Sequence, residues 1–152
     1  MTALELELEP ADSLSVFVAG TPATQGSMRY VGQSNAGRAI LTSDNKHVKP
    51  WRTDVRAALI DNQGQPRVRF EGPVHIDLEF ILPRPKSAPK RKTPSADRSR
   101  MSDIDKLERA ILDSVTSAGV WRDDAQVTSV SKVKRIAEIG ETPGCRISLR
   151  GL

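Results

Sequence analysis

The chain has 152 residues, of which 38% are apolar and 28% charged, so it can bury one hydrophobic core but is too short for two. Its 23 Lys and Arg residues exceed its 19 Asp and Glu residues, and the resulting net charge of +4 is compatible with a polyanionic partner. This composition excludes wholesale disorder, and the single cysteine, Cys145, excludes an intramolecular disulfide.

The first twelve residues differ from the rest in charge. They contain four acids and no base, and the alternation of apolar and acidic residues from Leu4 to Glu9 fits an edge strand as well as a loose arm. We treat residues 1–12 as an acidic N-terminal arm and residues 13–152 as one domain. There is no apolar run of about 18 residues and no positively charged leader, so we expect a cytoplasmic protein with no membrane partner.

The first half of the domain predicts two strands and one helix. The apolar run Ser15–Ala19 indicates a buried strand, residues 20–28 a loop, and Ala39–Thr42 a second short strand. Apolar residues then recur at helical spacing over residues 51–59, and Asn62 is expected to end that helix.

A long strand and a basic loop follow. Alternation is clearest in Val74–Leu82, where five apolar residues face one way and the polar residues between them face the other. Residues 83–100 contain seven bases, four prolines and one acid, Asp97. Because the prolines oppose regular structure and little in the segment can be buried, the sequence predicts a mobile basic loop.

The second half predicts a helix and two closing strands. A buried stripe supports a helix from Ile104 to Ala118, which Gly119 ends. Strands are expected from Gln126 to Ile136 and over residues 145–149. The order of elements indicates an α+β domain in which two main helices pack against a small mixed β-sheet.

Two pairs of acids flank the second helix. Asp103 and Asp105 lie at its start, and Asp123 and Asp124 lie just beyond the turn that follows it. If the chain folds back there the four carboxylates meet, and since ionised carboxylates repel one another, a divalent cation would hold them together. Each pair alone has a plainer interpretation, as helix-terminal acids, with Asp105 and Glu108 resembling a capping box, or as a polar turn.

Other candidate residues leave two interpretations open. Arg109 lies one turn after Asp105 and one turn before Asp113, so ion pairs along the helix are as well supported as contact with a phosphate. His47 and His75 fit no zinc spacing, and neither a Walker A loop nor a dinucleotide fingerprint is present. Zinc and nucleotide chemistries are therefore set aside.

The motif D-I-D-K-L-x-R-A-I-L-D, followed after a short spacer by G-V-W-R-D-D-A-Q-V, resembles the RusA-like endodeoxyribonucleases. These are Holliday junction resolvases often carried by phages and prophages. The resemblance covers residues 102–127 most strongly, and the element order from Val16 onward also agrees. Where members of that family have an asparagine and a lysine, this chain has Lys106 and Arg109.

The resemblance implies a homodimeric α+β nuclease that cuts branched DNA, four-way junctions above all, in a paired manner. It implies that Mg²⁺, with Mn²⁺ as a substitute, is bound by Asp103, Asp105 and Asp124, and that Arg109 assists catalysis. We expect the basic loop to hold the DNA backbone through five bases: Lys90, Arg91, Lys92, Arg98 and Arg100. The alternatives are a non-catalytic DNA-binding protein that selects branched structures and, with less support, a protein-interaction module.

Overall fold

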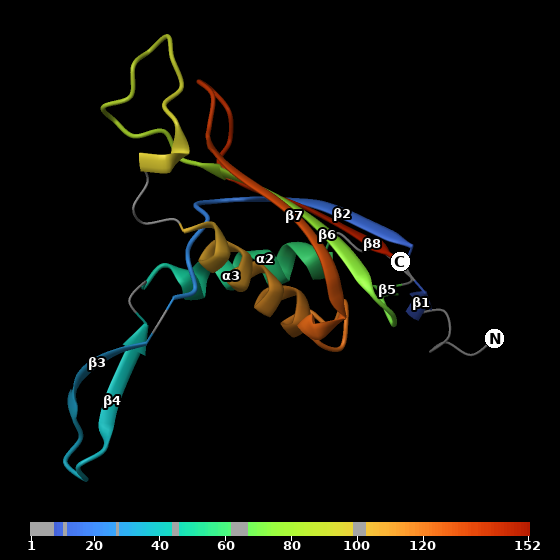
Figure 1. The fold of residues 1–152 in the computed structure, drawn as a ribbon, viewed down its shortest axis with the longest axis horizontal. Coiled ribbons are helices and arrows are strands. Elements are labelled where there is room, and N and C mark those ends of the chain that lie inside the picture. The colour runs from blue at the N-terminus through green and yellow to red at the C-terminus, as the bar shows by residue number, and fades with distance from the viewer. Residues whose placement is uncertain (1–7, 11, 27, 44–45, 62–66, 99–102) are drawn as a thin grey trace.

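The structure, a computed structural model, describes residues 8–10, 12–26, 28–43, 46–61, 67–98 and 103–152. Its elements in chain order are β1 (Leu8–Pro10), β2 (Ser13–Ala19), β3 (Met28–Gln33), β4 (Ala39–Ser43), α2 (Val48–Asp61), β5 (Arg67–Arg69), β6 (Val74–Leu82), η1 (Ala96–Arg98), α3 (Ile104–Ser117), η2 (Asp124–Gln126), β7 (Val127–Ile136) and β8 (Gly144–Gly151). The predicted α+β class is confirmed, with α2 and α3 on one face of a mixed sheet (Figure 1). Neither of these helices has the length and apolar content to cross a bilayer.

The main sheet has four strands in the order β2-β8-β6-β7. β8 runs antiparallel to both β2 and β6, whereas β6 and β7 are parallel. Parallel neighbours need a long connection, and the chain makes it through the basic loop and α3. β7 consequently lies at one edge of this sheet, and β2 lies at the other.

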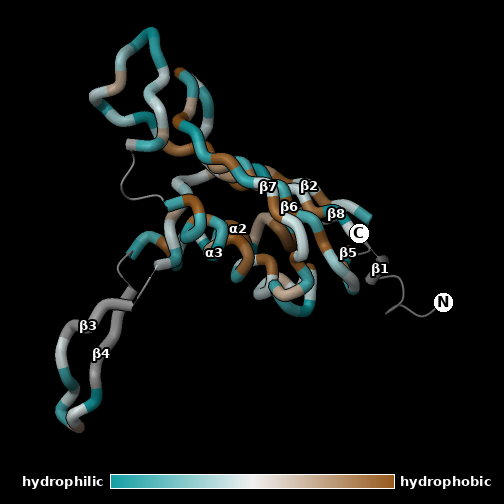
Figure 2. The backbone as a smooth tube through the Cα atoms, viewed as in Figure 1, coloured by the Kyte–Doolittle hydropathy of each residue, from teal (hydrophilic) through white to brown (hydrophobic). Residues whose placement is uncertain are grey.

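The hydrophobic core lies between the sheet and the two helices. α3 contributes Leu107, Ile111 and Val115, all fully buried and spaced four residues apart, as an apolar stripe requires. Truncating Leu107 to alanine would cost about 2–5 kcal/mol of folding free energy. Figure 2 shows the apolar residues concentrated where helices and sheet meet. Cys145 lies in this core, and burial raises the pKa of its thiol, so it packs as an apolar residue.

The other face of the sheet carries polar contacts. His75 Nδ1 is hydrogen-bonded to Ser129 Oγ at 2.8 Å, and His75 Nε2 to Asp77 Oδ1 at 2.9 Å. Nearby, Glu79 is paired with both Arg135 and Arg146. The alternation in β6 therefore predicted correctly that its two faces differ.

Two small sheets complete the fold. β4 confirms the predicted strand at Ala39–Thr42, but its antiparallel partner β3 was not predicted, and together they form a hairpin that projects from the body (Figure 1). β1, which lies within the predicted acidic arm, pairs in parallel with β5. Both β3 and β5 lack the extended apolar alternation that marks β6, and this is why the sequence pattern missed them.

Candidate functional site

At its N-terminus, α3 presents two exposed carboxylates. The N-cap residue is Asp103, whose backbone is extended and whose carbonyl accepts the amide hydrogens of Lys106 and Leu107 at 3.1 and 2.9 Å. Its side chain makes no capping hydrogen bond and lies 3.5 Å from Lys106 Nζ. The predicted capping box of Asp105 and Glu108 is wrong, because Asp105 lies inside the first turn and Glu108 bonds to Lys132 at 3.0 Å.

Asp105 has no local partner among the residues that the structure describes. Within the described ranges it forms no ion pair and no side-chain hydrogen bond, and its side chain is exposed. The helix N-terminus beside it favours negative charge. Asp105 is therefore available to bind a cation.

At the far end of α3, the second acidic pair lies in a well-anchored turn. Trp121 is buried and donates its indole hydrogen to Thr116 Oγ1 at 2.6 Å. Gln126 donates from Nε2 to the carbonyls of Phe70 and Gly72, both at 3.0 Å, and its Oε1 accepts the Arg122 amide at 2.8 Å. These bonds hold η2 against the connection between β5 and β6.

The two acids of this turn differ in their bonding. Asp123 caps η2, because its Oδ1 accepts the Ala125 amide at 2.9 Å, and this bond lowers the pKa of Asp123. A side-chain hydrogen bond with Asp123, followed by burial and the negative charges of Asp123 and Asp113, raises the pKa of Asp124. Asp123 is therefore used by the turn, whereas Asp124 is exposed beside it.

The two acidic pairs do not meet within one chain. α3 has 14 residues, so its ends are about 21 Å apart, and Figure 1 shows α3 as one straight helix. Accordingly, no group of three or more His, Cys, Asp or Glu residues among those described could hold a metal ion. The expected convergence within one chain is wrong, because β7 begins at the far end of α3 and only its C-terminal end returns toward Asp103.

Arg109 is exposed one turn into α3. In the described part of the chain it makes no salt bridge, so the ion pairs with Asp105 and Asp113, one of the two interpretations left open by the sequence, are absent there. The loop before β3 is fixed to the same first turns of α3, since the Gln25 amide donates to the Lys106 carbonyl at 3.0 Å. Arg109 is thus a base near two exposed acids that pairs with no described residue.

The basic loop leads into the N-terminus of α3. Lys90, Arg91 and Lys92 are exposed and pair with no described acid. The side chain of Arg98 and all of Arg100 lie outside the described residues. Figure 1 shows the loop rising from the end of β6 on the side of the molecule where α3 begins. Bases and acids therefore lie at the same end of the fold.

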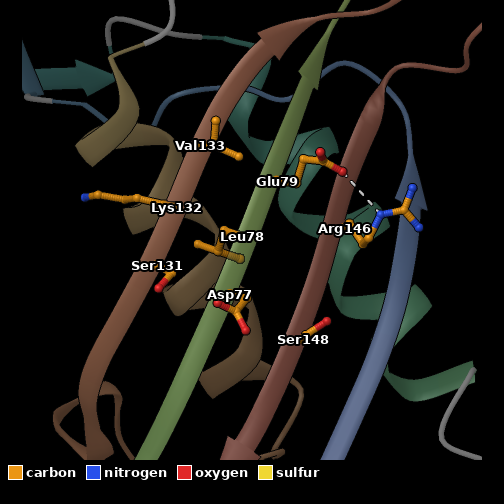
Figure 3. A pocket seen from close by; sticks show the side chains of 8 residues that line it. All are labelled: Asp77, Leu78, Glu79, Ser131, Lys132, Val133, Arg146 and Ser148. Carbon is orange, nitrogen blue, oxygen red and sulfur yellow. Dashed lines mark hydrogen bonds and ion pairs between the residues drawn. The ribbon is translucent and has the colours of Figure 1, made fainter.

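A groove of about 270 Å³ lies elsewhere, on the face of the sheet opposite the helices (Figure 3). Glu79 and Arg146 form an ion pair across it, with Glu79 Oε1 at 3.3 Å from Arg146 Nε, and Ser131 and Ser148 also line it. Arg146 also lies over the Phe17 ring, with its guanidinium carbon 5.4 Å from the ring centroid. Because its charged groups are already paired, this groove is a weaker candidate than the end of α3.

Comparison with known proteins points to one family. The family model described as endodeoxyribonuclease RusA matches residues 19–150. An uncharacterized protein YqaN of Bacillus subtilis (strain 168) is 26% identical over 136 residues, which is 84% of this chain and 90% of that protein. A crossover junction endodeoxyribonuclease RusA of Shigella sonnei (strain Ss046) is 29% identical over 116 residues, which is 76% of this chain and 77% of that protein. The crossover junction endodeoxyribonuclease RusA of Escherichia coli (strain K12) is 30% identical over 110 residues, which is 66% of this chain and 87% of that protein.

Proposed function

This chain belongs to the RusA family of endodeoxyribonucleases, and we propose that it resolves Holliday junctions by paired, Mg²⁺-dependent hydrolysis of phosphodiesters as a homodimer. Family membership makes it a crossover junction endodeoxyribonuclease that acts on branched DNA. The metal, the dimer and the roles of single residues are our proposal. The observation that carries it is the pair of exposed carboxylates, Asp103 and Asp105, where α3 follows the basic loop.

We assign Asp103, Asp105 and Asp124 as the metal ligands. Their exposed carboxylate oxygens are the hard donors that Mg²⁺ prefers, and Asp123 is excluded from the set because its side chain caps η2. The bound ion, Mg²⁺ or Mn²⁺ in its place, would supply Lewis acidity and a readily deprotonated water for hydrolysis. Since the acidic pairs lie at opposite ends of α3, one chain cannot supply all three ligands to one ion.

A twofold dimer removes this difficulty. β7 is an edge strand of ten residues, and no described strand pairs with its outer side. An unpaired edge accepts a strand from another chain. Two of its three bases are held by acids of the same chain, Lys132 by Glu108 and Arg135 by Glu141. Two exposed apolar side chains, Val130 and Val133, remain to be covered.

Pairing β7 with β7 of a second copy about a twofold axis would place each strand's start opposite the partner's end. Asp124 opens η2, the short turn that leads directly into β7. Lys132, in the second half of β7, pairs with Glu108 in the early part of α3 at 3.0 Å, so this half of β7 lies toward the start of α3. The axis would therefore bring Asp124 of one protomer toward Asp103 and Asp105 of the other, and do so twice. Two such sites match the two cuts that resolve a four-way junction.

The remaining residues bind and orient the DNA. Arg109 lies one turn after Asp105 and pairs with no residue that the structure describes, and it would neutralise charge that develops on the phosphoryl oxygens. Lys90, Arg91 and Lys92, with Arg98 and Arg100, would contact the backbone without reading its sequence. Affinity for the junction should consequently fall steeply as salt is added.

Mixing two inactive variants tests the shared site. Asp105→Asn and Asp124→Asn should each lose cleavage of a labelled four-way junction in Mg²⁺ while still binding it in EDTA. After subunit exchange, the mixed dimer retains one intact site, so single-strand nicking should return without paired cutting. The control is Asp113→Asn, which alters the same helix and should cleave normally.

The outcomes separate the parts of the proposal. Wild-type cleavage together with a mixture that stays inactive would contradict the site shared between protomers. Junction binding with no metal-dependent cleavage by the wild type would instead favour the non-catalytic DNA-binding alternative. Sedimentation analysis of the wild type supplies the oligomeric state independently of activity.

A further inference from the structure

The basic loop is held by one of its own bases. Arg84, two residues beyond β6, donates from Nη1 to Thr93 Oγ1 at 2.9 Å and to the Ala137 carbonyl at 3.1 Å. From Nη2 it donates to the carbonyls of Pro89 and Lys92, at 2.6 and 3.1 Å. One guanidinium thus joins the beginning and the middle of the loop to the segment that follows β7.

A second contact extends this anchor. Thr93 Oγ1, which accepts from Arg84, donates to Glu138 Oε2 at 2.6 Å. Ala96 then buries its side chain at the end of the loop. The prolines and bases of the loop have few apolar contacts to make, so these polar anchors take the place of a core.

The arrangement leaves the other bases facing solvent. Lys86, Lys90, Arg91 and Lys92 are exposed, and none pairs with an acid in the described part of the chain. Holding like charges together is unfavourable unless a polyanion neutralises them. A loop that is already shaped also loses less conformational entropy when it binds, which strengthens binding.

We infer that Arg84 is a positioning residue that preforms the basic loop for the DNA backbone and does not itself contact DNA. This inference rests on the proposed function. All four hydrogen bonds use the planar fork of the guanidinium, whose donors reach acceptors on three segments at once. Lysine keeps the charge but has a single ammonium group, so Arg84→Lys removes the anchor and leaves the electrostatics intact.

The experiment measures loop structure and DNA binding separately in the full-length protein. Limited trypsin digestion reports on the loop, whose cleavage sites include Lys90, Arg91 and Lys92. Position 84 is not such a site with either arginine or lysine, because Pro85 follows it. We expect Arg84→Lys to be cut within residues 86–93 roughly tenfold faster, with its melting temperature nearly unchanged.

Binding of a labelled four-way junction in EDTA at several salt concentrations gives the second readout. Arg84→Lys should bind roughly tenfold more weakly with an unchanged dependence on salt, because no phosphate contact is lost. The matched control, Arg91→Ala, should digest normally outside its altered site and lower the slope of log affinity against log salt by about 0.9. If Arg84 acted only through its charge, Arg84→Lys would change neither trypsin digestion nor junction binding.

Wild-type binding by Arg84→Lys, or wild-type resistance to trypsin, would overturn the inference. If Arg84→Lys fails to fold, Thr93→Val carries the same test, since it removes one anchor while keeping the side-chain shape. Unchanged digestion and binding in that variant would likewise overturn it. If the unaltered chain binds no junction, the proposed function itself fails and the inference fails with it.

Discussion

The two ends of α3 each carry a pair of aspartates, yet the surrounding backbone uses them differently. At the start of the helix, Asp105 has no partner among the described residues, and the Asp103 side chain leaves the helix amides uncapped. At the far end, Asp123 is bound by the Ala125 amide, and only Asp124 of that pair remains exposed without a capping role. Carboxylates that do not serve the fold are the ones available to a ligand.

Asp105→Asn removes the proposed metal ligand at the start of α3 and should have the largest effect. If Asp105 binds the metal as proposed, replacing its carboxylate by an amide weakens that binding, so junction cleavage should fall about a thousandfold, while the melting temperature stays within a degree or two. Cleavage kinetics and thermal unfolding measured on the same preparations provide the check. A large loss of stability would instead show that Asp105 serves the helix terminus.

Substituting Asp123 and Asp124 one at a time tests whether the two neighbouring acids have different roles. Asp124→Asn should lose cleavage nearly as completely as Asp105→Asn, with little change in stability. Asp123→Ala removes the cap and should loosen the turn, lowering the melting temperature while retaining measurable cleavage. Equal losses of cleavage in both variants, at unchanged stability, would contradict the division of roles.

Glu141 is a contrasting acid, because both of its carboxylate oxygens accept hydrogen bonds within the fold. Both of its oxygens accept from Arg135, at 2.6 and 2.7 Å, and this lowers the pKa of Glu141 from 4.5 to about 2. Because the folded pKa is depressed, its contribution to stability is present above pH 4.5 and is lost as the pH falls toward 2. Glu141→Gln should therefore unfold more easily at neutral pH and show a flatter stability profile between pH 4.5 and 2. Denaturant titrations of Glu141→Gln and the wild type between pH 2 and 7 measure this difference in stability. Junction cleavage by Glu141→Gln at neutral pH should match that of the wild type.

Glu108→Gln, between the two ends of α3, should have the smallest effect. Its ion pair with Lys132 joins α3 to β7 at 3.0 Å but is partly exposed, so its loss should cost less than about 1 kcal/mol. Chemical denaturation measures that cost. Since it removes an acid close to the proposed ligands without removing a ligand, its Mg²⁺ requirement should match that of the wild type.

Local sequence pattern predicted most of the main sheet and both helices. β6 was predicted at its observed bounds, because strict alternation fixes both its period and its buried face. The buried stripe of α3 and the end of this helix before Gly119, whose φ is +76°, were also predicted from the sequence. β4 was predicted, but β3 and its pairing with β4 were not, because β3 lacks an extended apolar alternation and the hairpin is separate from the main sheet.

The basic loop shows a different limit. Its bases and prolines were visible in the sequence, but the acceptors that Arg84 uses are mostly backbone carbonyls, which every residue carries. No residue pattern distinguishes a carbonyl that will meet a guanidinium from one that will meet water. Arg84 was therefore counted with the other bases of the loop, although the structure gives it an anchoring position.

By itself, the sequence determined both main helices and the strands of the main sheet, which faces they bury, and that acids flank one helix. Those properties depend on the order of neighbouring side chains and on the backbone period. Only the tertiary structure decided that Asp103 and Asp105 lie a helix length from Asp124, and that β7 is left at a sheet edge. Distances between segments depend on how the elements pack, and local periodicity carries no information about them.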